Sequence, residues 1–284
     1  MNPLEQVVLA FESLAHAIRQ LFRPSLWAPW LLVLGAQLVV LVVLWWFAHP
    51  WLSWFAAPVL LRVSGERALH YPDIFGLLPE LYARADVVIG VLVGSVVAGA
   101  STALFAARFS GRPIPPSQGM RRALSRAAVL VLANLPLSLL LMGFSLGLDW
   151  WLVAREGPAM IARLAPVLTL GMAVVLQALF IWVNPLLMIG GRSLTETLKA
   201  LPRAASHGGW TALTLAAAAT IPLLPTQVLV RGAEQIVRFG TPEVVGWLVL
   251  IQALIALVTA FVLTGGSVIA YHSLVGPALE GDDL

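Results

Sequence analysis

Six long apolar runs that contain no Asp, Glu, Lys or Arg dominate this chain and restrict what it can fold into. An α-helix needs roughly 20 apolar residues to cross a bilayer core, and every run has that length. The runs lack the alternation of barrel strands, and only helices pair all their backbone groups within one segment. They are Trp27–Phe47, Val87–Ala107, Ala127–Leu148, Val167–Ile189, Gly208–Val230 and Val244–Ala270. We predict an all-α polytopic bundle, with residues 1–284 forming a single integral membrane domain of six transmembrane helices.

The composition excludes a water-soluble globule, because 60% of the residues are hydrophobic and only 11% are charged. Soluble domains carry about 25% charged residues. The net charge of +3 does not indicate nucleic acid, since the basic residues lie in short loops beside the spans. The chain has no cysteine, which excludes disulfides, thiolate metal sites and a cysteine nucleophile. We also expect no cleaved signal peptide, because the first run follows an amphipathic segment and is long enough to span.

The distribution of Lys and Arg predicts the orientation. Ten of them lie on the side of the N-terminus and of the second and fourth loops, and seven lie on the other side. The second loop carries five arginines and no acid. Since positive loops stay in the cytoplasm, we predict a multi-pass protein of the bacterial inner (cytoplasmic) membrane with both termini in the cytoplasm.

The longest connection, residues 48–86, is aromatic-rich, amphipathic and broken by Pro58, Pro72 and Pro79. Such segments favour the headgroup layer, so we expect a belt at the outer helix ends. A ligand lid or a partner-docking surface is the alternative. The acids of the external loops are interpreted as ordinary solvated surface, because arginines lie near them. They are Asp73, Glu80, Asp86, Asp149 and Glu156.

A short basic amphipathic segment precedes the first, third and fifth runs, which predicts a three-unit internal repeat of interfacial helix, span in and span out. The last two copies share Gly-Arg at residues 111–112 and 191–192, and Ala-Leu-x-Arg-Ala at 123–127 and 200–204. Basic side chains on such helices reach lipid phosphates, each contributing about 1 kcal/mol near an anionic surface. The candidate lipid-phosphate contacts are Arg112, Arg121, Arg122, Arg126, Arg192, Lys199 and Arg203.

The segment around the third copy resembles a bacterial six-span family related to the membrane domain fused to some glycerophosphodiester phosphodiesterases. The residues that carry the resemblance are Pro185, Ile189, Gly191, Ser193, Glu196, Leu198, Lys199, Arg203, Gly208 and Trp210. The chain departs from the family pattern at Gly190, Leu201 and Pro202, where an acid, a serine and an aromatic residue are usual. The resemblance implies the six-span layout. It implies no phosphodiesterase activity, since that chemistry belongs to a separate soluble domain.

Uncharged polar residues and prolines in the spans form a second set of candidates. A buried amide must be paired, so these side chains should face the bundle interior, either as interhelical contacts worth about 0.6 kcal/mol each or as a polar lining for a headgroup or solute. Prolines beside them predict kinks in the third and fifth spans. The candidates for polar lining or kinks are Asn134, Pro136, Gln177, Asn184, Pro185, Pro222 and Gln252, with Thr220 and Gln227 as further polar positions.

Small residues predict close helix packing, within the chain or in a homodimer. Gly90 and Gly94 form a GxxxG pair, which Ser95 and Gly99 continue at the same spacing. Gly265 and Gly266 form a similar notch in the last span.

No catalytic motif is present, and the five histidines lie in five different segments without a metal-ligand spacing. We therefore expect neither an enzyme nor a cofactor. The first functional hypothesis is a non-enzymatic accessory or scaffold subunit of an envelope membrane complex, with membrane lipids and other membrane subunits as partners. The second is a lipid or small-molecule transporter that works at the interface of the helical repeats. A proton-coupled pump is disfavoured, because the predicted spans contain no ionisable group.

Overall fold

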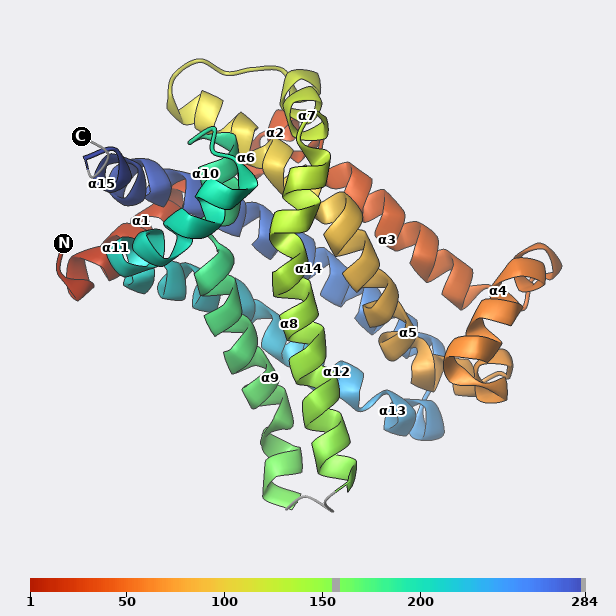
Figure 1. Ribbon diagram of the computed structural model, residues 1–284. Coiled ribbons are helices and arrows are strands. Elements are labelled where there is room, and N and C mark those ends of the chain that lie inside the picture. Colours follow the sequence, from red (N-terminus) through yellow and green to blue (C-terminus); the bar gives the residue numbers. More distant parts are fainter. Residues whose placement is uncertain (155–158, 282–284) are drawn as a thin grey trace. The chain divides into compact units, whose positions relative to one another are not determined.

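The computed structural model describes residues 1–154 and 159–281, and within these residues the chain is helical and has no strand (Figure 1). The N-terminal part consists of α1 (Pro3–Arg19), η1 (Gln20–Phe22), α2 (Pro24–Trp27), α3 (Trp30–Trp45), α4 (Pro50–Ser64), η2 (Glu66–Leu69), α5 (Asp73–Ile89), the π-helical turn η3 (Gly90–Gly94), α6 (Ser95–Phe109) and α7 (Pro116–Leu124).

The C-terminal part continues with α8 (Ala127–Ala154), α9 (Ala159–Phe180), α10 (Val183–Met188), α11 (Leu194–Thr220), η4 (Ile221–Leu223), α12 (Leu224–Arg231), α13 (Ala233–Phe239), α14 (Glu243–Ala270), the π-helical turn η5 (Tyr271–Val275) and α15 (Gly276–Gly281).

Within the described residues, five helical segments are long and apolar enough to span a membrane, and a sixth is obtained if α3 and α4 count as one span bent by 94°. The five are Asp73–Phe109, Ala127–Phe144, Val167–Met188, Leu194–Arg231 and Glu243–Leu279. The chain is thus an all-helical protein with the composition of a multi-pass membrane protein.

The helices of the structure differ in extent from several of the predicted spans and connections, most clearly for residues 48–86. The prediction had Pro58 and Pro79 breaking this connection, whereas Pro58 lies inside α4 and Pro79 inside α5. The second span was predicted to begin at Val87, but its helix begins at Asp73 and runs through η3 into α6. At 1.5 Å per residue its 37 residues extend for about 55 Å, well beyond a hydrocarbon core of about 30 Å.

The segments expected to be interfacial helices are helical, and two of them start in the same way. A capping box formed by Asn2 and Glu5 begins α1, and one formed by Ser193 and Glu196 begins α11. Left-handed glycines precede two of the segments, with φ of 72° at Gly111 before α7 and 66° at Gly191 before α11. Only glycine adopts this conformation without strain, which accounts for its use in both places.

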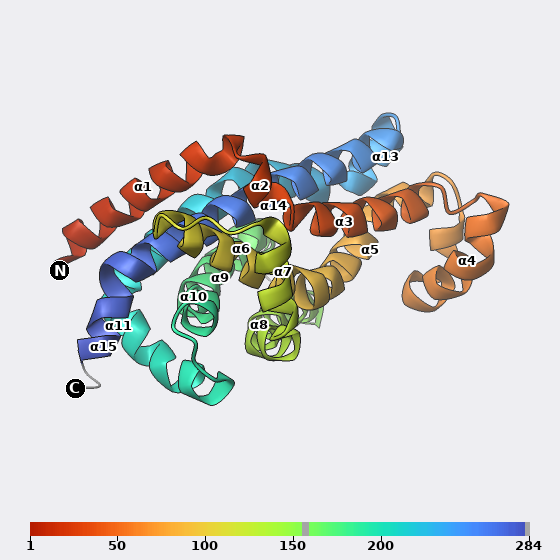
Figure 2. The same ribbon diagram turned by 90° about the horizontal axis from the view of Figure 1, so that it is seen from above.

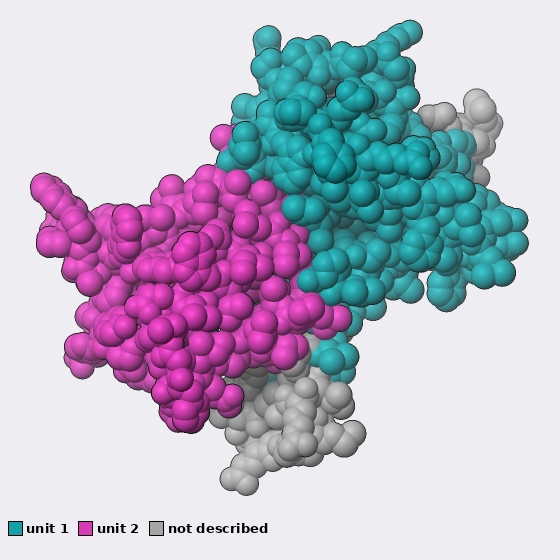
Figure 3. All heavy atoms as spheres, turned by 180° about the vertical axis from the view of Figure 1, so that it is seen from behind, with its two compact units in different colours: residues 1–31, 91–222, 258–284 teal, residues 32–90, 223–257 magenta. Residues whose placement is uncertain are grey.

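The described helices divide into two compact units, which Figure 3 colours teal and magenta. Unit 1 comprises residues 1–31, 91–222 and 258–284, and unit 2 comprises residues 32–90 and 223–257.

Unit 1 is built around α11, which packs against α1 and α9, while α8 lies alongside α9 (Figure 1). The view from above shows α7 packed against α6 (Figure 2). Trp182, which is fully buried, fits against Gly208, where α11 has a non-helical residue with φ −119° and ψ 22°. The amphipathic first half of α11 and its apolar second half are therefore joined through a break at a glycine that the tryptophan covers.

Unit 2 has an aromatic centre. Trp45 at the end of α3 makes edge-to-face contacts with Phe75 of α5 and Trp247 of α14. A Cβ added to Gly246 would lie 2.2 Å from the Trp45 ring, so the ring occupies the space that this glycine leaves open. α13 packs against α5 in the same unit. These contacts fix the positions of α5 and α14 beside one another.

Candidate functional site: a polar pocket in unit 2

A cavity of about 200 Å³ lies between three helices of unit 2. Its lining contains one carboxylate, one guanidinium, two carboxamides and one phenol among small apolar side chains. The lining residues are Pro79, Tyr82, Ala83, Asp86, Gln227, Val230, Arg231, Val249, Gln252, Ala253 and Ala256. Binding sites commonly have this makeup, in which a few polar groups converge in an apolar cleft.

Helical periodicity explains why these residues come together. On α5 the lining positions 79, 82, 83 and 86 follow the i, i+3, i+4, i+7 pattern of a single helix face. The positions 249, 252, 253 and 256 repeat that pattern on α14, and 227, 230 and 231 supply one turn of it on α12. The pocket is thus formed by one face from each helix.

Asp86 forms a hydrogen bond with a glutamine of α3, a helix that does not line the pocket. The Nε2 atom of Gln37 donates a hydrogen bond of 2.8 Å to Oδ1 of Asp86. Gln37 is 6% exposed and lies near the middle of α3, a helix without any charged residue. Burying a glutamine side chain among apolar residues costs free energy unless the side chain is hydrogen-bonded. The bond to Gln37 places Asp86 beside the middle of α3.

Two buried polar atoms beside this carboxylate have no hydrogen-bond partner among the described residues. They are the hydroxyl of Tyr82, one turn before Asp86 on α5, and Oε1 of Gln37. Tyr82 is 7% exposed and lines the pocket. An unpaired buried polar group costs about 1–3 kcal/mol, so the Tyr82 hydroxyl and Oε1 of Gln37 are polar atoms that a bound polar group would stabilise.

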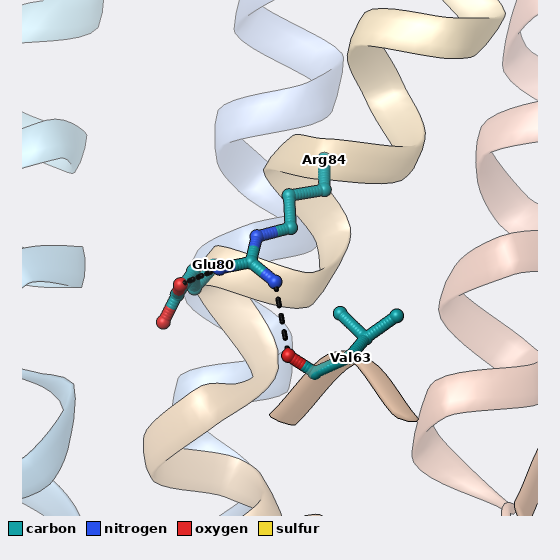
Figure 4. A network of polar contacts seen from close by, with 3 residues as sticks. All are labelled: Val63, Glu80 and Arg84. Carbon is teal, nitrogen blue, oxygen red and sulfur yellow. Dashed lines mark hydrogen bonds and ion pairs between the residues drawn. The ribbon is translucent and has the colours of Figure 1, made fainter. Parts of the chain in front are cut away.

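Some charged groups of unit 2 outside the pocket form ion pairs. Arg84 pairs with Glu80 and donates a hydrogen bond of 3.2 Å to the carbonyl oxygen of Val63 (Figure 4). Arg67 lies 4.0 Å from Asp73 and 3.6 Å from Glu234. Within the described part of the chain, no ion pair includes Asp86 or Arg231. The pocket is therefore lined by one acidic and one basic side chain that do not form an ion pair with each other.

Sequence interpretation missed Asp86, which it grouped with the solvated loop acids. The signal for a functional role was present one turn earlier, because Tyr82 and Asp86 share a helix face once Pro79 is accepted inside a helix. Gln252, predicted as polar lining, does line this pocket, and so does Gln227.

The other predicted polar residues come together at two places in unit 1. Asn134 of α8 donates a hydrogen bond of 3.1 Å to Oδ1 of Asn184 in α10 and one of 2.8 Å to the carbonyl oxygen of Leu130. Thr220 donates a hydrogen bond of 2.8 Å to the carbonyl oxygen of Ala216, and its hydroxyl oxygen also lies 3.4 Å from Oε1 of Gln177. These amides thus form contacts between helices, as the first of the two predicted roles requires.

Asn134→Ala is expected to lower the free energy of unfolding by about 0.6 kcal/mol, the mean for hydrogen bonds between membrane helices. Asn184→Ala should cost a similar amount, because it removes the same contact. Unfolding of the purified protein, followed in a double-mutant cycle, measures the coupling between the two side chains. Additive losses would show that the two amides do not interact.

Two of the three predicted prolines lie at or near helix irregularities. Pro222 is in the 3-10 turn η4 between α11 and α12, which interrupts the fifth predicted span. Pro185 follows the break between α9 and α10, an interruption of the fourth span that the sequence did not predict. Pro136 lies inside α8.

Most of the predicted lipid-phosphate contacts are exposed, namely Arg112, Arg121, Arg122, Lys199 and Arg203, while Arg126 and Arg192 are half-buried. Arg126 donates a hydrogen bond to the carbonyl oxygen of Leu187 and so ties the start of α8 to α10. Its guanidinium has further donors, but one of them is used within the protein.

The predicted packing glycines differ among themselves. A Cβ on Gly99 would lie 2.6 Å from Leu130, and a Cβ on Gly265 would lie 2.9 Å from the Cβ of Ala17. Gly266 similarly lies against Leu215, at 3.1 Å. Gly90 has no atom within 4 Å of an added Cβ, and together with Gly94 it bounds the π-helical turn η3. Close packing within the chain therefore uses Gly99, Gly265 and Gly266.

Unit 1 contains a second cavity, of about 380 Å³, near the end of α14. His16 and His272, which lie far apart in the sequence, both line it together with Phe109, Ser110, Ile269 and Ser273. Both histidines are exposed, so this cavity lacks the buried polar groups of the unit 2 pocket. In the described residues no three His, Asp or Glu side chains gather as a metal site.

No family model, curated protein or solved structure matches the chain. The resemblance to the six-span family therefore stays a prediction.

Proposed function

We propose that the chain is a non-enzymatic membrane transporter that takes a small polar molecule or a lipid headgroup into the unit 2 pocket. One observation carries this proposal. Asp86 belongs to the helical segment Asp73–Phe109, which is long and apolar enough to span a membrane, and it is hydrogen-bonded to Gln37 and lines a cavity. Ionisable residues within membrane segments are costly, and where they occur they mark pathways for ions and substrates.

The depth of Asp86 supports a role within the membrane rather than at its surface. Its partner Gln37 is the eleventh of the 21 residues in the first apolar run, close to the run's centre. A hydrogen bond of 2.8 Å requires the two side chains to lie at the same level. Of the two functions that the sequence suggests, transport accounts for a carboxylate at this level, and a scaffold needs none.

We place the transporter in a cytoplasmic membrane with both termini in the cytoplasm, as the arginine-rich loops predict. This orientation needs an even number of crossings. The bent pair α3 and α4 would then have to supply one crossing beside the five long helical segments.

An accessory role in a membrane complex is a second candidate, favoured by one feature of α4. Trp51 and Trp54 are 82% and 85% exposed, and Phe55 beside them is also exposed. A partner subunit or a headgroup layer would cover this aromatic surface. Copurification in mild detergent tests the accessory role, and loss of a specific partner in a Trp51→Ala, Trp54→Ala variant would support it.

Thiol labelling tests the transport proposal without knowledge of the substrate, because the chain contains no cysteine. We expect Ala83→Cys, in the pocket lining, to react with a charged methanethiosulfonate in both right-side-out and inside-out vesicles. A cationic reagent should react roughly 3–10 times faster than an anionic one, because Asp86 attracts cations in a site of low dielectric. Asp86→Asn should remove that preference.

Val88→Cys is the matched control for this labelling. Val88 is 56% exposed. It lies on the side of α5 opposite Asp86, because an advance of two residues along a helix is a rotation of about 200°. A lipid-facing thiol stays protonated and unreactive, so this variant should not be labelled. If residue 83 is labelled from only one side of the membrane, or from neither side, the transport proposal is contradicted.

A further inference from the structure

Resting on the proposed transport function, we propose that the ligand of the unit 2 pocket is a small zwitterion with a primary ammonium group and a phosphate or carboxylate group. Asp86 and Tyr82 would hold the ammonium, and Arg231 would hold the anionic group. The inference follows from the polar atoms of the pocket, their burial and their charges.

The acidic end of the pocket offers acceptors for an ammonium group. Oδ1 of Asp86 is bonded to Gln37, and Oδ2 has no partner among the described residues. The hydroxyl of Tyr82, also without a partner in that part of the chain, lies one turn away on the same face of α5. An ammonium has three donors, so it can bond the carboxylate, the phenol oxygen and one carboxamide oxygen at once.

The basic end comes from α12. Arg231 lines the pocket one turn after Gln227, and Gln252 of α14 lines it as well. A guanidinium binds a phosphate or carboxylate with two parallel hydrogen bonds, and a carboxamide N–H can add a third. This end therefore suits an oxyanion.

The charges of the lining select a ligand with both groups. Asp86 and Arg231 line the same cavity without forming an ion pair. A purely cationic ligand would leave Arg231 without a counter-charge, and a purely anionic ligand would leave Asp86 without one. Asp86 is half-buried and Arg231 is exposed, so the unpaired carboxylate is the costlier of the two charges, and a zwitterion is the ligand that pairs with both.

The size of the pocket limits the ligand to a small group. Its volume of about 200 Å³ lies below the range of about 300–1,000 Å³ that is typical of sites for drug-sized molecules. Phosphoethanolamine fits the required chemistry, and it occurs both as a free molecule and as the headgroup of phosphatidylethanolamine. The two sources share the ammonium and the phosphate that the pocket recognises.

Protection of Ala83→Cys from a thiol reagent tests this ligand class. The full-length variant is placed in phosphatidylcholine nanodiscs and reacted with neutral 2-hydroxyethyl methanethiosulfonate, so that charge changes do not alter the approach of the reagent. Phosphoethanolamine, ethanolamine and inorganic phosphate are added in turn. We expect phosphoethanolamine to protect at concentrations about tenfold or more below those of either single-charge probe, the ratio that one charge-assisted contact supplies.

A second set of nanodiscs distinguishes the two sources. Protection by soluble phosphoethanolamine supports a free ligand, whereas protection only when phosphatidylethanolamine replaces part of the phosphatidylcholine supports a lipid headgroup. Phosphatidylglycerol, which has no ammonium, should not protect. Equal protection by ethanolamine alone or by inorganic phosphate alone would overturn the zwitterion.

Variants assign the two ends. In the Ala83→Cys background, Asp86→Asn and Arg231→Gln should each raise the concentration needed for protection by about tenfold or more. Arg84→Gln, which changes a charge outside the pocket, should leave it unchanged. If Asp86→Asn does not fold, Tyr82→Phe serves in its place and should weaken protection by phosphoethanolamine but not the labelling itself.

Failure of this inference and failure of the transport function give different results. If no probe protects residue 83 although it is labelled from both sides of the membrane, the ligand class is wrong and transport stands. If residue 83 is labelled from neither side, the transport proposal fails first.

Discussion

Trp182→Ala is expected to be the most destabilising single substitution in unit 1, with a loss of about 3–5 kcal/mol in the free energy of unfolding. Among the side chains that the structure describes, Trp182 is the largest that is fully buried, and the backbone of Gly208 lies directly against its ring. Truncation leaves a cavity next to the break in α11, where the helix cannot close in without losing its bend. Thermal unfolding of the purified protein measures the effect.

Trp210→Ala is the control for this substitution, because Trp210 belongs to the same unit and is 53% exposed. Its loss should stay within about 0.5 kcal/mol. Trp182→Phe should cost less than Trp182→Ala, since it fills most of the space and also removes an indole N–H that has no partner among the described residues. Equal losses for Trp182→Ala and Trp210→Ala would show that the contact with Gly208 does not stabilise the fold.

Gly246→Ala is expected to destabilise unit 2 by about 1–3 kcal/mol, the usual cost of overpacking. Its Cβ would lie 2.2 Å from the Trp45 ring, and Phe75 and Trp247 restrict how far that ring can move. A fall in the thermal midpoint of the purified protein measures the cost.

Gly35→Ala on α3 is the matched control, because a Cβ there meets no atom within 4 Å. It should be neutral or slightly stabilising, as expected for Gly→Ala in a helix. The double variant Trp45→Leu, Gly246→Ala should lose less than the sum of the single losses, since the smaller side chain relieves the overlap. Full additivity would mean that the two residues do not compete for space.

The existence of the long helices could be predicted from the sequence, because runs of about 20 apolar residues have few alternatives. The start of the second span could not. A window that rejects charged residues stops at Asp86, whereas the helix continues back to Asp73. Asp86 itself is bonded to Gln37 from another helix. A pairing between residues 49 positions apart is invisible to a local pattern.

The candidate site shows the same limit. Sequence patterns singled out Asn134, Asn184 and Gln252 as polar residues in apolar runs, but they could not show which of these side chains contact one another. Asn134 and Asn184 bond each other in unit 1, and Gln252 lines a pocket in unit 2. Gly208 was predicted only as the first residue of a span, and its broken helical geometry depends on the ring of Trp182.

The π-helical turn at residues 90–94 has a consequence for how this protein can vary. Such a turn accommodates one more residue than an α-helical turn, which shifts the helix faces that follow it by about 100°. The residues of α5 that line the pocket and the residues of α6 around Gly99 therefore do not follow a single helical periodicity in the sequence. One additional residue in a helical turn therefore changes which of the following side chains share a helix face, and no loop is needed for this change.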